Sequence, residues 1–405
     1  MGRTWEAARG PRSSGKRIGV NAGLHSHWNL LKNPGLLSAH FLAPYRPPGR
    51  RIGAGLTYSQ RMRSRRDDST SAGKQGELAL LREIRARAAR ASGAGLRLGI
   101  GDDCALLRPR AGEELAVTTD LSIAGRHFRL DWHPPEAVGH RTLARGLSDL
   151  AAMGARPVAA FVSIGLPQNL IRKERGRSPW IDRFFDGLLA LAEAYKTPLA
   201  GGDLAESSAA VADIVLIGAV PRGKALLRSG ARPGDLLYVT GSLGGAAAGL
   251  ARLAELAAGR RHPRFPRIPK KFHPLLAAHL YPQPRIPQGI WLRQRGLATA
   301  ALDLSDGLST DLAHLCEESG VAAEVDAAAL PISPAATLAQ ALNGGEDYEL
   351  LFTAAPAARI PRAIAGVPVT RIGRMVRARA SKPLVALVTA QGVQALEAHG
   401  WEHFL

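Results

Sequence analysis

The 405-residue sequence has only two cysteines, Cys104 and Cys316, and it contains neither a Cys-x-x-Cys pair nor a His-Glu-x-x-His motif. A disulfide framework and a zinc site are therefore not indicated. No apolar run approaches the length of a membrane span, and the N-terminus lacks the continuous apolar core of a secretory signal. These absences favour a protein of the reducing cytoplasm that does not enter a membrane.

Two glycine-rich stretches look like nucleotide-binding loops, but each lacks a required residue. Residues 218–224 have the spacing of a P-loop, yet Ala225 stands where Ser or Thr would hold Mg²⁺, and Pro221 interrupts the loop. Residues 99–104 fail as a dinucleotide fingerprint because Cys104 replaces the third glycine. Neither the P-loop nor the dinucleotide-binding class is indicated.

Basic charge is unevenly distributed along the chain. The formal net charge is +19, and residues 1–73 hold thirteen Arg or Lys against three Asp or Glu, a net of +10. This segment is rich in Gly, Pro, Ser and Arg and shows no sustained apolar period, which predicts a disordered tail. A basic arm could bind nucleic acid, and an Arg-rich leader could be a transit peptide or translated sequence upstream of the true start. We interpret residues 1–73 as a dispensable extension.

Strands and helices alternate over the rest of the chain, which predicts an α/β (α+β) fold. Length favours two domains, 74–226 and 227–405, and residues 260–288 are expected to form a long basic, proline-rich loop with a helix at 273–280. The other helices are expected at 77–90, 134–154, 179–195, 246–257, 308–319 and 356–364. Strands are expected at 98–100, 115–119, 158–164, 199–203, 211–220, 236–240, 321–325, 348–352, 369–372 and 384–388.

Acidic and hydroxyl side chains gather between residues 99 and 128. Asp102 and Asp103 follow one short apolar run, and Thr118, Thr119 and Asp120 close the next, so we expect them at strand ends and in the turns beyond. Hard oxygen ligands of this kind suit Mg²⁺, which usually also binds phosphate oxygens. The alternative for Gly-Asp-Asp alone is a turn with a solvated acidic tip.

Further acidic groups occur in both halves of the chain. Asp149 lies beside the apolar stripe of the helix at 134–154, where the helix dipole does not favour it, and an exposed position on a polar face is the alternative. Asp203 follows a strand, Asp303 and Asp306 precede a helix, and Glu346 lies in an acidic turn. The glycine loop at 241–245, before the helix at 246–257, could present backbone amides to an anion. Because clustered like charges are unfavourable without a cation, the pattern indicates bound metal ions.

The order of these motifs resembles the thiamine-monophosphate kinase family, within the superfamily of aminoimidazole ribonucleotide synthetase and selenophosphate synthetase. The resemblance runs from about residue 76 to the C-terminus. The motifs that carry it are Gly-Ile-Gly-Asp-Asp-Cys-Ala (99–105), Thr-Thr-Asp (118–120), Gly-Arg-His-Phe (125–128), Leu-Ser-Asp-Leu-Ala-Ala-Met-Gly-Ala-Arg-Pro (147–157), Gly-Gly-Asp (201–203), Arg-Ser-Gly-Ala-Arg-Pro-Gly-Asp (228–235), Asp-Leu-Ser-Asp-Gly-Leu (303–308) and Gly-Gly-Glu-Asp-Tyr-Glu-Leu (344–350).

This resemblance implies ATP-dependent phosphorylation of thiamine monophosphate in a cytoplasmic homodimer, with a dimerising N-terminal α/β domain and a C-terminal α/β domain. It implies several Mg²⁺ ions held by Asp103, Thr118, Thr119, Asp120, Asp149, Asp203, Asp303 and Asp306. The implied ATP contacts are Gly202, Asp203, Arg228 and Ser305. The implied acceptor contacts are His127, Glu346 and Trp401.

The sequence departs from the family pattern at Gly146, usually Asn, and at Leu204-Ala205, usually Thr-Thr; the N-terminal tail and the 260–288 loop are additional. No general base is expected, because a phosphate acceptor with a second pKa of about 6 is already nucleophilic at neutral pH. Two alternatives stay open. Another ATP-dependent synthetase of the superfamily, of the selenophosphate or aminoimidazole ribonucleotide type, would keep the metal carboxylates, and a basic RNA-binding protein would depend on residues 1–73.

Overall fold

The structure is a computed structural model that describes residues 77–89, 93–172, 178–258 and 273–400, all within one compact unit, Thr70–Leu405. The predicted tail at residues 1–73 and the candidate Trp401 lie outside the described residues. Among the described residues, no helix combines the length and the apolar character that crossing a membrane requires. Cys104 is exposed and Cys316 is buried, and both are free thiols.

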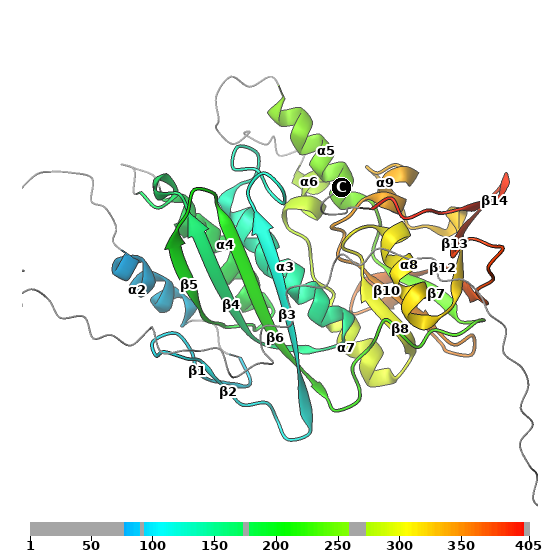
Figure 1. The fold of residues 1–405 in the computed structure, drawn as a ribbon, viewed down its shortest axis with the longest axis horizontal. Coiled ribbons are helices and arrows are strands. Elements are labelled where there is room, and N and C mark those ends of the chain that lie inside the picture. The colour runs from blue at the N-terminus through cyan, green and yellow to red at the C-terminus, as the bar shows by residue number, and fades with distance from the viewer. Residues whose placement is uncertain (1–76, 90–92, 173–177, 259–272, 401–405) are drawn as a thin grey trace, which may run out of the picture. The chain divides into compact units, whose positions relative to one another are not determined.

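A four-stranded sheet of order β3-β6-β4-β5 forms the first half of the fold (Figure 1). β6 pairs antiparallel with both β3 and β4, whereas β5 runs parallel to β4. The strands are β3 (Glu113–Ile123), β4 (Arg156–Leu166), β5 (Leu199–Glu206) and β6 (Val211–Pro221). The short strands β1 (Leu96–Leu98) and β2 (Leu106–Leu107) pair with each other, and α2 (Glu77–Ala88) contacts α4 (Trp180–Ala194) and β5.

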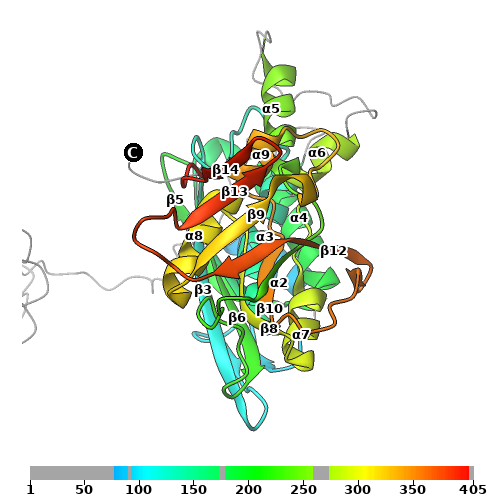
Figure 2. The same cartoon turned by 90° about the vertical axis from the view of Figure 1, so that its right-hand side faces the viewer.

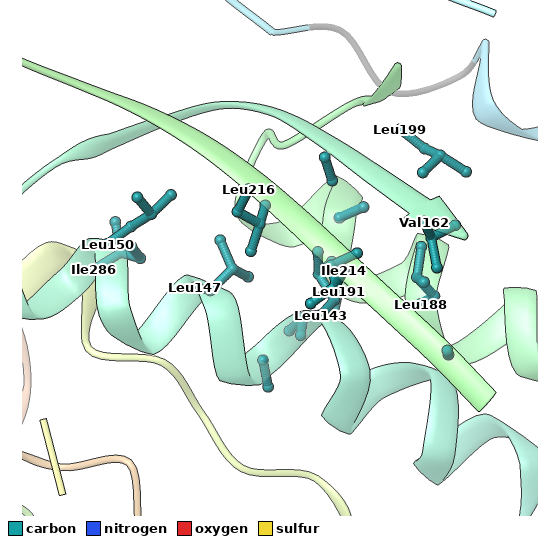
Figure 3. Close-up of a cluster of buried hydrophobic side chains, with 14 of the residues drawn as sticks. Leu143, Leu147, Leu150, Val162, Leu188, Leu191, Leu199, Ile214, Leu216 and Ile286 are labelled. Carbon is teal, nitrogen blue, oxygen red and sulfur yellow. The ribbon is translucent and has the colours of Figure 1, made fainter. Parts of the chain in front are cut away.

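One face of this sheet is covered by α3 (Pro135–Ala152), against which α4 packs. Leu143, Leu147 and Leu150 recur at helical spacing on α3 and are fully buried, because they pack toward Ile214 and Leu216 of β6 (Figure 3). Burial of each such side chain stabilises the fold by about 1.5–3 kcal/mol. The long α3 is therefore fixed against the sheet, and its polar positions keep defined places.

A second, eight-stranded sheet forms the other half, with β14-β13-β9-β12-β7-β10-β8 as its path and β11 paired to β12 (Figure 2). Its strands are β7 (Leu236–Thr240), β8 (Ala298–Asp303), β9 (Ala322–Asp326), β10 (Leu350–Ala354), β11 (Ala363–Ile364), β12 (Val367–Val376), β13 (Val385–Thr389) and β14 (Gly392–Ala395). Its helices are α5 (Gly245–Ala257), α6 (His273–Leu280), α7 (Ile286–Arg295), α8 (Leu308–Ser319) and α9 (Leu338–Asn343), with a short 3₁₀ turn at Ala327–Ala329. A second 3₁₀ turn, Gln168–Leu170, follows β4 in the first half.

The two halves share a core. α6 and α7 contact α3, and Ile286, Leu350 and Phe352 belong to the same buried cluster as the leucines of α3. The connection between β6 and β7 contains the predicted domain boundary at residue 227. Side chains from both halves can therefore meet along α3.

Most predicted elements are confirmed, and the errors have local causes. The predicted helix at 356–364 is wrong: the segment is irregular and ends in β11, because Pro356 and Pro361 cannot donate backbone hydrogen bonds and restrict their neighbours. Thr118 and Asp120 lie within β3 rather than at its end, because pairing with β6 continues to residue 123. Asp203 likewise lies inside β5, not in a turn. The helices α7 and α9 were not predicted.

Candidate active site

A cavity of about 530 Å³ lies between β3, α3 and two turns of the second half. Asp120 comes from β3 and Asp149 from α3, while Asp303 ends β8. Ser305 and Asp306 follow in the next turn, and His127 and Glu346 complete the wall. The pocket therefore joins acidic groups that are up to 226 positions apart in the sequence, between Asp120 and Glu346.

The alternation of β3 directs Thr118 and Asp120 toward α3. There the Thr118 hydroxyl donates a hydrogen bond to Asp149 Oδ2 at 2.5 Å. Burial raises the pKa of Asp149, against the lowering effects of this hydroxyl and of the charges of Arg228 and Arg145. Asp149 is thus a half-buried carboxylate whose hydrogen-bond partner is neutral.

Asp303 has the same kind of environment. The Ser148 hydroxyl donates to Asp303 Oδ2 at 2.6 Å, and Asp303 is 5% exposed. Burial, followed by the nearby charge of Asp149, raises the pKa of Asp303 to about 8. Two neighbouring carboxylates with hydroxyl partners repel each other when both are ionised, so this part of the pocket favours a cation.

Asp120 differs, because it pairs with Arg145 of α3 at 2.7 Å. Burial raises the pKa of Asp120 to about 6, although the charge of Arg145 opposes this effect. The Arg145 guanidinium also donates to the carbonyl of Leu121 at 3.2 Å, while its Nε has no hydrogen-bond partner in the part of the chain that the structure describes. Sequence reasoning missed Arg145, whose role depends on a contact between separate elements.

The turn after β8 is held by Asp311 of α8, which the sequence analysis also missed. Its Oδ2 accepts backbone N–H groups from Ser305, Asp306 and Gly307, each at 3.0 Å. Burial raises the pKa of Asp311 to about 7 although these three donors lower it. An acidic residue in the first turn of the predicted helix was the available signal. Asp311 fixes the backbone that presents Ser305 and Asp306.

A second turn carries Glu346 in a left-handed conformation with φ 68°. The next residue, Asp347, accepts the N–H groups of Gly244 at 2.6 Å and Ala246 at 3.0 Å, so it fills the N-terminus of α5. The glycine loop that the sequence offered for an external anion is therefore occupied by the chain's own carboxylate. This contact anchors the turn that presents Glu346.

The structure separates the remaining candidates from the pocket. Thr119 and Asp203 lie on the face of the sheet opposite α3, and Gly202 also lies on β5, at the edge of the sheet far from β3. Asp103 is exposed in the turn after β1, where its N–H donates to Asp102. Arg228 does not line the pocket, although its charge reaches Asp149.

As the side chains stand, no three His, Cys, Asp or Glu residues within the described ranges form a metal-ligand set. The donors nevertheless fit Mg²⁺, because the half-buried Asp149 and the buried Asp303 are carboxylates with raised pKa values and neutral hydrogen-bond partners. Mg²⁺ needs only one or two protein carboxylates when waters and substrate phosphates supply the other ligands.

Two models of AIR synthase related proteins match the chain: the N-terminal domain at residues 101–220 and the C-terminal domain at residues 232–385. The thiamine-monophosphate kinase of Salmonella typhimurium is 42% identical over 298 residues, which cover 71% of this chain and 86% of that protein. The Escherichia coli K12 enzyme is 41% identical over 300 residues, with the same coverage of 71% and 86%. The chain belongs to the thiamine-monophosphate kinase family.

Solved structures of the family support this assignment. Thiamine-monophosphate kinase from Stenotrophomonas maltophilia is 38% identical, with a TM-score of 0.63 over 77% of this chain and 96% of that chain. The structure of AaThiL complexed with AMPPCP and TMP is 30% identical, with a TM-score of 0.62 over 84% of this chain and 100% of that chain. The predicted family and the predicted α/β fold with N-terminal and C-terminal AIR synthase domains are confirmed.

Proposed function

We propose that this chain transfers the γ-phosphoryl group of ATP to the phosphate of thiamine monophosphate and so forms thiamine diphosphate. The activity is a phosphotransferase reaction with a phosphate group as acceptor, as the names of the curated relatives state. The observation that carries the proposal to this chain's own residues is the pair of carboxylates with hydroxyl partners, Asp149 and Asp303, in a pocket formed by both halves.

The main obstacle to this reaction is repulsion between two polyanions. Asp120, Asp149 and Asp303 would hold Mg²⁺, and the metal would neutralise phosphate charge and align the reacting groups. Asp311 keeps the backbone around Ser305 and Asp306 in place on the same side of the pocket. The chain needs no general base, because the acceptor phosphate is mostly ionised at neutral pH.

The two substrates are assigned to different parts of the pocket. Ser305 is assigned to the ATP side, together with Arg228, which lies outside the pocket wall and acts through its charge. His127 and Glu346 are assigned to the thiamine side, where a carboxylate can face a cationic or amino-bearing ring. Four further residues are proposed on motif similarity alone. Gly202 and Asp203 are proposed to contact ATP, and Asp103, Thr119 and Asp203 to bind metal. Their positions outside the pocket make them weaker candidates than Asp149 and Asp303.

A homodimer is part of the proposal, formed by the outward face of the four-stranded sheet. Leu115, Val117 and Leu121 alternate on that face of β3 and are 45%, 61% and 44% exposed. Ile217 pairs with Val117 across the sheet and extends the apolar surface. Contiguous exposed apolar surface of this kind marks association sites. We further propose the domain division 74–226 and 227–405 and a cytoplasmic location.

The direct test is ADP release by the purified full chain with ATP, Mg²⁺ and thiamine monophosphate. We expect turnover with thiamine monophosphate and none above background with selenide or with formylglycinamidine ribonucleotide as acceptor. Preferential turnover with either of the latter would assign the chain to another synthetase of the superfamily. Light scattering checks the dimer, and Val117→Glu should produce a monomer.

A further inference from the structure

Two buried histidines from opposite halves of the chain meet in the wall of the pocket, on its thiamine side. His133 precedes α3 and His279 lies in the last turn of α6, with Nε2 atoms 2.9 Å apart. They are 2% and 1% exposed. The proposed phosphoryl transfer uses neither ring, so the pairing of the two rings needs a separate explanation.

The hydrogen bonds around the pair fit either direction of the ring protons. His133 Nδ1 lies 3.0 Å from the N–H of Arg129 and 3.3 Å from its carbonyl, so this nitrogen can accept or donate. Arg141 Nη1 lies 2.9 Å from Nδ1 and 3.0 Å from Nε2 of His279. Because a guanidinium only donates, the unprotonated nitrogen of a neutral His279 accepts from Arg141 in either tautomer. His279 Nδ1 also lies 3.4 Å from Glu346 Oε2.

Both rings are held in the neutral form. Burial, with the charge of Arg141, lowers the pKa of His133 to about 4 and that of His279 well below its usual value. A neutral pair can share a single proton between two Nε2 atoms, whereas two imidazolium rings at 2.9 Å would repel each other.

Arg141 of α3 connects the same groups. Its Nη2 donates to Glu346 Oε1 at 2.5 Å and to the carbonyl of His127 at 3.3 Å, and its Nη1 donates to the carbonyl of His279 at 2.7 Å. The Arg141 side chain is 5% exposed, against 27% for Glu346. Both acceptor candidates, His127 and Glu346, are thus attached to one buried guanidinium.

We propose that His279 is a positioning residue for the acceptor: its ring and its carbonyl hold Arg141, which fixes the carboxylate of Glu346, so that α6 sets acceptor affinity through Glu346. This inference rests on the proposed role of Glu346. A carboxylate on a left-handed turn residue gains its orientation from such partners, and preorganisation improves binding because less side-chain freedom is lost.

The contact between His279 and Arg141 is not needed to hold α6 in place. Leu276 and Leu280 of α6 are buried in a cluster with Leu253 and Ala137. Downstream of the helix, His140 of α3 donates from Nε2 to the carbonyl of Pro282 at 2.8 Å. His140 is also a buried histidine that joins α3 to this segment, but its hydrogen bond goes to Pro282 and its ring packs against Tyr281, so it provides a matched structural control.

The first experiment compares KM values with kcat. His279→Leu should raise the KM for thiamine monophosphate about tenfold and leave the KM for ATP and kcat within about twofold. His279→Asn can place an amide oxygen where it accepts from Arg141 Nη1 and should restore most of the affinity. His140→Leu should lower the melting temperature and leave the KM for thiamine monophosphate unchanged. Equal increases in that KM for His279→Leu and His140→Leu, or no increase for His279→Leu, would overturn the inference.

The second measurement does not need turnover. In the full chain labelled with ¹⁵N-histidine, the ring nitrogens should show His133 and His279 both neutral, each with one protonated and one unprotonated nitrogen. Glu346→Gln should shift the His279 signals and leave those of His140 in place. Unchanged His279 signals would overturn the inference whatever the activity, whereas a wild-type chain that releases no ADP with thiamine monophosphate contradicts the proposed function alone.

Discussion

Two sets of carboxylates reach the same pocket, and their partners differ in charge. Asp149 and Asp303 accept hydrogen bonds from the hydroxyls of Thr118 and Ser148, whereas Glu346 is bound by the guanidinium of Arg141. A hydroxyl orients a carboxylate and leaves its charge in place, but a guanidinium also neutralises it. The first set is therefore suited to binding cations, and the second to a fixed wall that recognises shape and hydrogen-bonding groups.

The largest loss of turnover should follow removal of the charge of Asp149 or Asp303, the first set. Asp149→Asn or Asp303→Asn should lower kcat on the order of 10³-fold or more, because metal-mediated stabilisation of the transferring phosphoryl group contributes several kcal/mol. Turnover is measured at saturating ATP, Mg²⁺ and thiamine monophosphate, with circular dichroism to confirm folding. Asp186→Asn, which removes an exposed partner of Arg87, is the control and should behave as wild type. Wild-type turnover in either pocket variant would refute the metal assignment.

Removing the charge of Glu346, the guanidinium-bound carboxylate, should have a smaller effect, and only on the KM for one substrate. Glu346→Gln should raise the KM for thiamine monophosphate about tenfold, equivalent to about 1.4 kcal/mol, with little change in the KM for ATP. The amide keeps the shape of the wall and removes its charge. Steady-state kinetics with each substrate varied in turn decide the point. An equal loss of ATP affinity would show that Glu346 supports the whole pocket and that the two sets do not differ in role.

Local sequence patterns predicted the elements that carry both sets. The apolar spacing of Leu143, Leu147 and Leu150 placed α3 to within a few residues, and α8 has the predicted bounds, 308–319. β3 is longer than predicted, because Asp120 and Ser122 have turn-like composition and only pairing with β6 reveals the strand. Periodicity is a local signal, whereas strand length is decided by a partner almost a hundred positions away.

The sequence could not predict which side chains are the hydrogen-bond partners of these carboxylates. Arg141 and His279 are separated by 138 positions, and Arg141 and Glu346 by 205, so no motif joins them. The acidic residues were recognisable as motifs, but which hydroxyl, guanidinium or imidazole faces each one depends on the packing of α3 between the halves. The sequence therefore predicts that a metal pocket exists and does not predict which carboxylates are neutralised.

Asp120 belongs to the metal side but has a cationic partner, so it offers a finer test of the comparison. Arg145→Met should increase the affinity of the chain for Mn²⁺, used as a probe for Mg²⁺, by about threefold, because a partly exposed ion pair contributes about 0.5–1 kcal/mol. Titration calorimetry without substrates measures this affinity. Arg156→Met, which breaks the pair with Glu113 away from the pocket, is the matched control. Weaker Mn²⁺ binding in Arg145→Met would mean that Arg145 organises the site instead of competing for Asp120.

The smallest effect concerns stability of the metal-free chain. The pKa of Asp303 is raised to about 8, so at pH 4–8 the native state retains a proton that the unfolded chain releases, and stability from this group is lost as pH rises through about 8. Asp303→Asn removes this dependence and keeps an acceptor for Ser148. At pH 8 without metal the variant should melt above wild type by several degrees, and at pH 4 the two should coincide. Asp311 and Asp347, whose pKa values are raised to about 7, are present in both proteins and cancel from the difference. Mg²⁺ should then stabilise wild type more than the variant. A variant that melts below wild type at pH 8 would show that the carboxylate is already neutralised within the chain, and the contrast between the two sets would disappear.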